Sequence, residues 1–314
     1  MLHYTAYYFC KPGLISFLCK KIKGSKTTHT PRGAEPSGGM NILIRPAKTR
    51  NLKLLILITF TLLVFAGVKL YDLARISRHS YITVSETPAR HAALCQELGT
   101  EYKIDWFHLA AYFYAASEHE NLPYPGREEI ADLAAIAAEG DFLNYIKKMK
   151  GSKFAALTKI RAREIRIRQK FFSPEYTFPV GGEDFSFTNT WLAPRDGGSR
   201  QHLGTDIFAS EGTPLVACTG GTIERKGWNR LGGNRIGLRG RDGLYYYYAH
   251  LSGFAPGIEE GTQVTKGTVI GYVGHSGNAV NTPDHLHFGM QTPWGDWINP
   301  YHLAVYWEIL GDSS

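Results

Sequence analysis

The sequence predicts a multidomain protein with an N-terminal transmembrane helix, an α-helical middle region and a C-terminal, mainly antiparallel β domain. Three observations predict it: an uncharged apolar run at residues 54–68, helical periodicity in the residues that follow, and frequent glycine with short apolar runs after Pro174. We therefore expect four segments, namely a basic cytoplasmic tail at residues 1–50, a transmembrane anchor at 51–72, a helical region at 73–174 and the β domain at 175–305.

The positive charge of the chain is concentrated at its N-terminus. The formal net charge is +7 over 314 residues, but residues 1–53 hold ten Lys or Arg against one acid, Glu35. The remainder carries 25 basic and 27 acidic residues, which removes the main argument for a nucleic-acid-binding protein. We therefore expect no nucleic-acid partner.

The apolar run from Leu54 to Val68 lies between Lys53 and Lys69. As a helix, its fifteen residues cover about 22 Å of a hydrocarbon core of roughly 30 Å. Apolar neighbours lengthen the run, and the flanking lysines can reach the interface. Because the basic residues precede the run, we expect a single-pass anchor in the cytoplasmic membrane, with residues 72–314 outside. The alternative is a signal peptide whose cleavage gives a secreted protein.

Met40 opens a compact basic stretch immediately before the apolar run. We expect Met40 to be the true start and residues 1–39 to be an extension of the gene model. The alternative is a disordered basic tail, which the Thr, Pro, Gly and Ser content of residues 24–39 also favours.

Apolar residues at three- and four-residue spacing predict helices in the middle region. The expected helices are Ile104–Glu120, Arg127–Glu139, Asp141–Lys150 and Phe154–Phe172. The last one carries Lys or Arg in near alternation, which predicts a solvated face; contact with anionic wall polymers or lipid head groups is the alternative.

Two cysteines, Cys95 and Cys218, lie beyond the anchor, and the chain has no CxxC pair. This spacing gives neither a sulfur-based zinc site nor a disulfide framework. We expect two separate buried thiols, with one disulfide as the alternative.

Short apolar runs separated by glycine-rich turns predict an antiparallel β domain after residue 175. The expected strands are Leu203–Phe208, Thr213–Ala217, Gly221–Lys226, Arg235–Leu238, Leu244–His250, Thr268–Val273 and His285–Met290.

Five polar residues of this domain are spaced for one metal site: His202, Asp206, His250, His285 and His287. Two histidines and one carboxylate form the ligand set of a catalytic zinc, which keeps a fourth position for water. Residues two apart in a strand share a face, so His285 and His287 point the same way, as His202 and Asp206 can. The two remaining histidines can then move protons, which suggests a hydrolase.

Around these residues the sequence resembles the lysostaphin-type, or LytM-type, zinc endopeptidases of bacterial cell walls. The resemblance covers roughly residues 175–302 and is near-continuous. It rests above all on three motifs, His202-Leu-Gly-Thr-Asp206, Tyr248-Ala-His-Leu-Ser252 and His285-Leu-His-Phe-Gly289. The chain departs from many relatives at Asn281–Asp284, just before the last motif. This departure concerns the shape of the loop that these residues form.

The resemblance implies that His202, Asp206 and His287 bind Zn²⁺. It implies that His250 and His285 are catalytic and flank the metal-bound water and the scissile carbonyl. Residues 175–305 would then be a peptidase domain that cleaves cross-links or stem peptides of peptidoglycan. The expected partners are peptidoglycan and, through one helix, the cytoplasmic membrane. The alternative is a non-catalytic, membrane-anchored wall-binding scaffold or regulator of the same fold.

Overall fold

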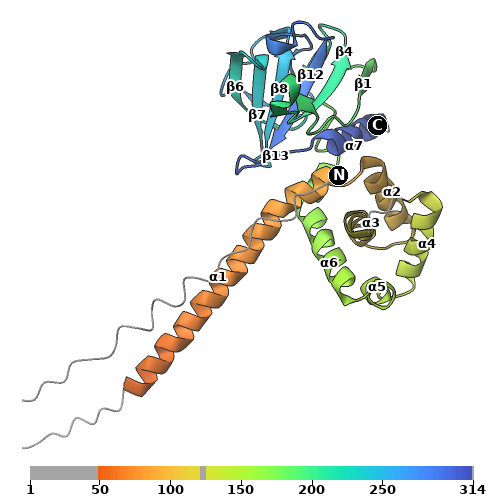
Figure 1. The fold of residues 1–314 in the computed structure, drawn as a ribbon, viewed down its shortest axis with the longest axis vertical. Helices are drawn as coiled ribbons and strands as arrows, with labels where there is room; N and C mark the ends of the chain where they lie inside the picture. The colour runs from red at the N-terminus through yellow and green to blue at the C-terminus, as the bar shows by residue number, and fades with distance from the viewer. Residues whose placement is uncertain (1–48, 121–124, 313–314) are drawn as a thin grey trace, which may run out of the picture. The chain divides into compact units, whose positions relative to one another are not determined.

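The computed structural model describes residues 49–120 and 125–312. Within them, the predicted fold class is confirmed: a helical N-terminal region with one apolar helix precedes an antiparallel β domain (Figure 1). The expectations for Met40 and for residues 1–39 fall outside the described residues.

The apolar run belongs to α1, a single helix from Thr49 to Glu86. Side chains from Leu54 to Leu70 are exposed, whereas those from Ser80 onward are largely buried. Among the described residues, α1 is the one helix long and apolar enough to cross a membrane. The expected anchor is therefore the first part of a longer helix whose last turns enter the protein core.

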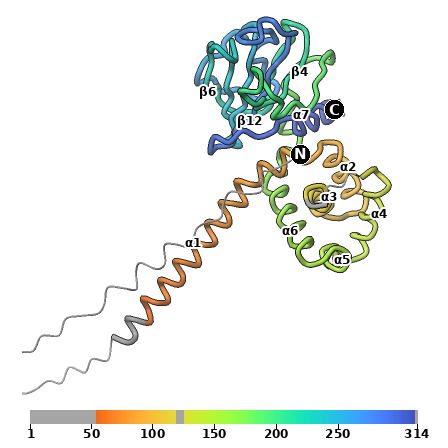
Figure 2. Tube along the Cα trace, in the orientation of Figure 1, coloured from red at the N-terminus to blue at the C-terminus, as the bar shows by residue number. Residues whose placement is uncertain are grey.

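Three of the four predicted helices of the middle region are confirmed with small shifts at their ends, whereas the fourth ends at Ile167 and is followed by a separate 3₁₀ helix (Figure 2). The helices are α2 (Ala89–Glu101), α3 (Trp106–Glu120), α4 (Arg127–Ala138), α5 (Phe142–Lys150), α6 (Ser152–Ile167) and the short 3₁₀ helix η1 (Gln169–Phe172). Asp141 caps α5 by accepting a hydrogen bond from the backbone N–H of Asn144. Gly151, at φ 89°, separates α5 from α6 and supplies a backbone angle that other residues rarely adopt.

One large antiparallel sheet carries most of the β domain (Figure 1). Its strand order is β1-β4-β12-β8-β7-β6-β10, and β13 pairs with β12. The strands are β1 (Phe185–Phe187), β4 (Thr205–Ala209), β6 (Gly221–Asn229), β7 (Gly233–Gly240), β8 (Tyr245–Leu251), β10 (Gln263–Val264), β12 (His285–Gln291) and β13 (Trp297–Ile298). All seven predicted strands are present.

Two smaller sheets and a final helix complete the domain. One sheet has the order β5-β11-β9, and the other is the hairpin β2-β3. These strands are β5 (Pro214–Val216), β11 (Val269–Tyr272), β9 (Gly253–Phe254), β2 (Pro194–Arg195) and β3 (Arg200–Gln201), and the final helix is α7 (Tyr301–Asp312).

Helix α7 packs against both the helical region and the β domain. Trp307 is fully buried, donates its indole N–H to the Phe171 carbonyl at 2.8 Å, and stacks on Tyr176 with ring centroids 5.1 Å apart. The core that contains Trp307 is continuous from Tyr81 of α1 to Phe288 of β12. The helical region and the β domain therefore share one hydrophobic core.

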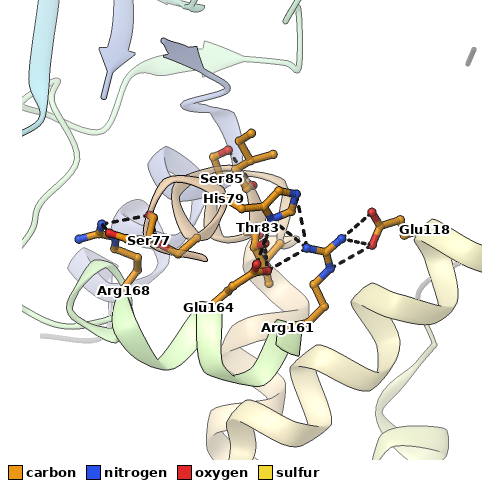
Figure 3. Close-up of polar contacts among 11 residues, drawn as sticks. Ser77, His79, Thr83, Ser85, Glu118, Arg161, Glu164 and Arg168 are labelled. Carbon is orange, nitrogen blue, oxygen red and sulfur yellow. Dashed lines mark hydrogen bonds and ion pairs between the residues drawn. The ribbon is translucent and has the colours of Figure 1, made fainter. Parts of the chain in front are cut away.

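A partly buried ionic network ties α1 to α3 and α6 (Figure 3). Arg161 donates to both Glu118 oxygens and, at 2.8 Å each, to Glu164 and to Nδ1 of His79. Thr83 of α1 donates to Glu164 at 2.7 Å. The prediction of a solvated face on this helix is wrong for Arg161, which is only 8% exposed. Its alternating basic neighbours Lys159, Arg163, Arg166 and Lys170 are exposed, as predicted.

Cys95 and Cys218 are both buried free thiols, as the sequence predicts. Burial raises the pKa of each thiol well above its ordinary value. Neither cysteine therefore has the character of a nucleophile or a metal ligand.

Candidate metal centre

Strand pairing brings the predicted ligands together. Strands β4 and β12 are antiparallel neighbours in a register that places His287 opposite Asp206. His202 lies three residues before β4, and its Nε2 is 2.9 Å from both Asp206 Oδ1 and His287 Nδ1. The third separation, from His287 Nδ1 to Asp206 Oδ1, is 3.0 Å. Three potential ligand atoms, one from each residue, thus converge on one point.

Gly204 makes this convergence possible. A Cβ at Gly204 would lie 2.6 Å from Cε1 of the His287 ring and 2.6 Å from the Phe288 carbonyl oxygen. Such distances are far inside van der Waals contact, so only glycine lets the His202–Asp206 segment pass this close to β12.

A backbone carbonyl fixes the tautomer of His202. Its Nδ1 is 3.0 Å from the Thr190 carbonyl oxygen, which can only accept a hydrogen bond. Nδ1 therefore carries the proton, and the Nε2 lone pair faces Asp206 and His287. In a tetrahedral zinc site with bonds of about 2.1 Å, ligand atoms lie roughly 3.4 Å apart. The separations here are a few tenths of an ångström shorter, so these three residues fit a zinc ion.

Asp206 is held as a carboxylate. Burial alone would raise its pKa, but its close contacts with the His202 and His287 rings outweigh burial and hold the pKa well below its usual range. Its other oxygen, Oδ2, accepts a hydrogen bond from Nη2 of Arg195 at 2.5 Å. Oδ1 therefore faces the histidines while Oδ2 faces an arginine that the sequence analysis did not select.

His250 and His285 lie beside the three convergent atoms. Their ring centroids are 4.9 Å apart, and His285 Nε2 is 4.0 Å from Asp206 Oδ1. The Nδ1 atoms of both rings are 2.8 Å from backbone carbonyls, that of His250 from Ser276 and that of His285 from Pro283. Each Nδ1 therefore carries a proton in the neutral ring, which leaves Nε2 to accept another.

Backbone strain and burial both mark His250. It adopts φ 68°, a left-handed angle that is uncommon for a residue other than glycine. Its backbone N–H donates to the Gly232 carbonyl at 2.7 Å, which holds the end of β8 in this position. Burial lowers the pKa of His250 to about 4, so its ring is neutral at pH 7.

All five residues line one cleft of about 640 Å³. Its walls also include aromatic and aliphatic side chains, namely Phe208, Leu231, Tyr245, Tyr247 and Trp297. Two arginines, Arg195 and Arg200, complete one end. The cleft is therefore large enough for a peptide segment, and it combines an apolar wall with cationic groups.

The loop that departs from the family pattern holds a second polar group. Asp284 lies 2.6 Å from Nδ1 of His275, so its carboxylate contacts that ring. Together with Glu211, these two residues are also close enough to bind one ion, but they are more exposed than the first set. His275 thus has a partner in the loop before β12.

The groups that orient the site were not predictable from the sequence. Arg195 reaches Asp206 from a two-residue strand, and the carbonyls of Thr190, Ser276 and Pro283 fix three histidine rings. Backbone carbonyls carry no sequence signal, and a single arginine in a glycine-rich turn has none either. These contacts depend on the folded path of the chain.

The sequence of the β domain is similar to a known protein family and to several named enzymes. Residues 200–300 match the model of Peptidase family M23. The chain is 45% identical over 146 residues to the L-Ala–D-Glu endopeptidase of Bacillus subtilis. This match covers 43% of this chain and 44% of that protein. It is 42% identical over 93 residues to the glycyl-glycine endopeptidase ALE-1 of Staphylococcus capitis, which covers 29% of this chain and 25% of that protein.

Among solved structures, a candidate glycyl-glycine endopeptidase LytM from Ruminococcus gnavus aligns with a TM-score of 0.48 and 25% identity, over 71% of this chain and 88% of that one. The chain spans less than half the length of both curated relatives.

Proposed function

Because residues 200–300 belong to peptidase family M23, we propose that this protein is a zinc metalloendopeptidase that acts on peptides of bacterial peptidoglycan. One observation carries the proposal. His202 Nε2, Asp206 Oδ1 and His287 Nδ1 converge within 3.0 Å of one another, beside two histidines whose Nε2 atoms can accept protons. We place the peptidase domain at residues 175–305.

In the proposed reaction, the three convergent residues hold the metal and the two others move protons. A zinc ion held there would polarise the peptide carbonyl and lower the pKa of water. His250 and His285 flank that position, and a neutral ring accepts the proton of the attacking water at Nε2 and returns it to the leaving amine. The other ring, when it is protonated at Nε2, stabilises the negative charge that develops on the carbonyl oxygen, because its Nδ1–H is already bonded to a backbone carbonyl.

For the substrate, we propose the bond between L-alanine and D-glutamate in the stem peptide. The named L-Ala–D-Glu endopeptidase matches this chain at 45% identity over 146 residues, whereas the named glycyl-glycine endopeptidase matches over 93. The longer match and higher identity favour the stem peptide over a glycine bridge.

We also propose that α1 anchors the protein in the cytoplasmic membrane with residues 72–314 outside. The apolar side chains from Leu54 to Leu70 are exposed, and ten basic residues lie at positions 1–53. This orientation places the cleft on the side of the membrane where peptidoglycan lies.

Release of peptide fragments from purified peptidoglycan tests the activity. The full chain in detergent should release fragments, EDTA should abolish release, and added zinc should restore it. His285→Ala serves as the matched inactive protein. Binding without release by the zinc-loaded protein would contradict the proposal and favour the second candidate, a wall-binding scaffold of the same fold.

A further inference from the structure

The segment that precedes His202, the first proposed ligand in the sequence, lines part of the cleft. The backbone N–H of Leu192 donates to the His202 carbonyl at 2.8 Å, and that of His202 donates to the Ala193 carbonyl at 2.9 Å. The hairpin β2-β3 then pairs Arg195 with Arg200. The segment is thus tied to a metal-site residue at its base and presents two arginines to the cleft.

Arg195 uses only part of its hydrogen-bonding capacity inside the protein. Nη2 donates to Asp206 Oδ2 at 2.5 Å, and the side chain remains 35% exposed where it lines the cleft. A guanidinium has five N–H donors in a planar fork. The contact with Asp206 therefore holds the fork in place while other donors remain available to a molecule in the cleft.

Arg200 differs from its neighbour across the hairpin. Its Nε donates to Asp196 Oδ2 at 2.7 Å, so an exposed carboxylate already neutralises this guanidinium. Among the described residues that line the cleft, the one acid is Asp206, and its carboxylate already faces His202 and His287. Arg200 thus has a carboxylate of its own, whereas Arg195 shares Asp206 with two histidines and is the less fully neutralised of the two arginines.

We infer that Arg195 is a specificity-determining residue that binds the free carboxylate of the glutamyl residue next to the scissile bond. This inference rests on the proposed function. A glutamyl residue within a peptide keeps one carboxylate, whichever of its two carboxyl groups forms the chain. Arginine recognises a carboxylate through two parallel charge-assisted hydrogen bonds, whereas an amide offers neither the charge nor two acceptors.

The position of Arg195 fits this role. The Asp206 carboxylate lies between Arg195 and the histidines, because its Oδ2 faces Nη2 of Arg195 and its Oδ1 faces Nε2 of His202. A residue adjoining the scissile bond brings its own carboxylate into this neighbourhood. A glycine bridge has no side-chain carboxylate, so the arginine would favour a stem peptide over such a bridge.

Two synthetic stem peptides test the inference with the zinc-loaded full chain in detergent. One has the free glutamyl carboxylate, and the other has the same carboxylate converted to an amide. The unmodified protein should cleave the acid with a kcat/KM about 10- to 100-fold above that of the amide. Arg195→Gln should lower kcat/KM for the acid by this factor more than it lowers kcat/KM for the amide.

Arg200→Gln is the matched control, because it removes the same charge from the same cleft and should leave the acid-to-amide ratio unaltered. Arg195→Lys keeps a charge but lacks the fork, so it should retain part of the preference. Zinc content, measured for each protein, should not change.

Three outcomes have different meanings. Equal cleavage of both peptides by the unmodified protein overturns the role of Arg195 and leaves the proposed function standing. An equal loss for both peptides in Arg195→Gln, or a loss of zinc, shows that Arg195 only positions Asp206 and also overturns it. Cleavage of neither peptide by the unmodified protein refutes the proposed stem-peptide substrate, and the inference falls with it.

Discussion

At the scale of single residues, the contact at Nδ1 decides what each histidine can do. His202 and His250 both place Nδ1 against a backbone carbonyl, at 3.0 and 2.8 Å. The Nε2 atom of His202 lies 2.9 Å from two potential ligand atoms, whereas His250 has no such separation among the described contacts. Two rings in the same tautomer are therefore suited to different tasks.

We predict that ligand and proton-transfer residues separate by zinc content. His202→Ala and Asp206→Ala should lose both zinc and activity. His250→Ala should keep most of its zinc while activity falls about 10²- to 10⁴-fold, as expected for loss of a general acid–base group. Metal analysis of the purified variants, beside fragment release, measures both effects. If His250→Ala loses zinc as readily as His202→Ala, the assigned roles are wrong.

A second residue-scale prediction concerns Gly204. Gly204→Ala should push the His287 ring out of place, because the new Cβ would lie 2.6 Å from Cε1. We expect a loss of about 1–3 kcal/mol in the free energy of unfolding and a 10- to 100-fold weaker affinity for zinc. Gly253→Ala is the control, since a Cβ there meets no atom within 4 Å. Equal zinc affinity in the two variants would contradict the close-packing argument.

At the scale of elements, local patterns predicted the helices and strands, and distant contacts decided the exceptions. The periodicity of residues 154–172 predicted a helix with a charged, solvated face. Arg161 escapes that prediction because Glu118 and His79, its partners, lie 43 and 82 residues away in sequence. The same limit applies to Arg195. His285 and His287 could be placed together because they follow the two-residue repeat of a strand, and the other three candidate residues were selected because their motifs resemble those of a known family.

We predict that Arg161 stabilises the helical region far more than its neighbours do. Arg161→Ala leaves Glu164 buried without its cation, which should cost about 3–5 kcal/mol of unfolding free energy. Arg163→Ala, an exposed site on the same helix, should change it by no more than about 0.5 kcal/mol. Denaturant unfolding followed by circular dichroism measures both. Similar values for the two variants would show that the network contributes little.

The network should also make stability depend on pH through Glu164. Burial opposes ionisation, but hydrogen bonds from His79, Arg161 and Thr83 outweigh it and lower the pKa of Glu164 below its ordinary 4.5. A lowered pKa in the folded state adds stability above pH 4.5, and this stability is lost as pH falls through the folded-state pKa.

The stability difference between the unmodified protein and Glu164→Gln should therefore shrink as pH falls from 7 to below the ordinary pKa of 4.5. Unfolding free energies across this range measure it. Glu128→Gln, at an exposed position, is the control. A difference that stays constant with pH would exclude a depressed pKa at Glu164.

At the scale of the whole molecule, α1 combines two environments in one helix. Its apolar part is exposed, and its last turns, including Tyr81 and Val84, belong to the core shared with the β domain. The apolar run was predictable from the sequence, but the burial of the last turns of α1 was not. That burial depends on helices and strands far along the chain.

We predict that the β domain lies outside the cytoplasmic membrane. Protease added to intact protoplasts should digest residues 175–314, because the basic residues before Leu54 hold the N-terminus inside. Immunoblotting with an antibody to the C-terminal domain measures the loss, and a cytoplasmic protein serves as the control for intact cells. Protection of the domain would reverse the proposed orientation.

Strand β12 lies between β4 and β8 and supplies the last two histidines of the centre. Asp206 and His287 are 81 residues apart, so a chain still being synthesised has two of the three proposed ligands long before the third. No metal centre can form until β12 inserts between its neighbours. For the proposed peptidase, catalysis therefore begins only after β12 has folded into the sheet.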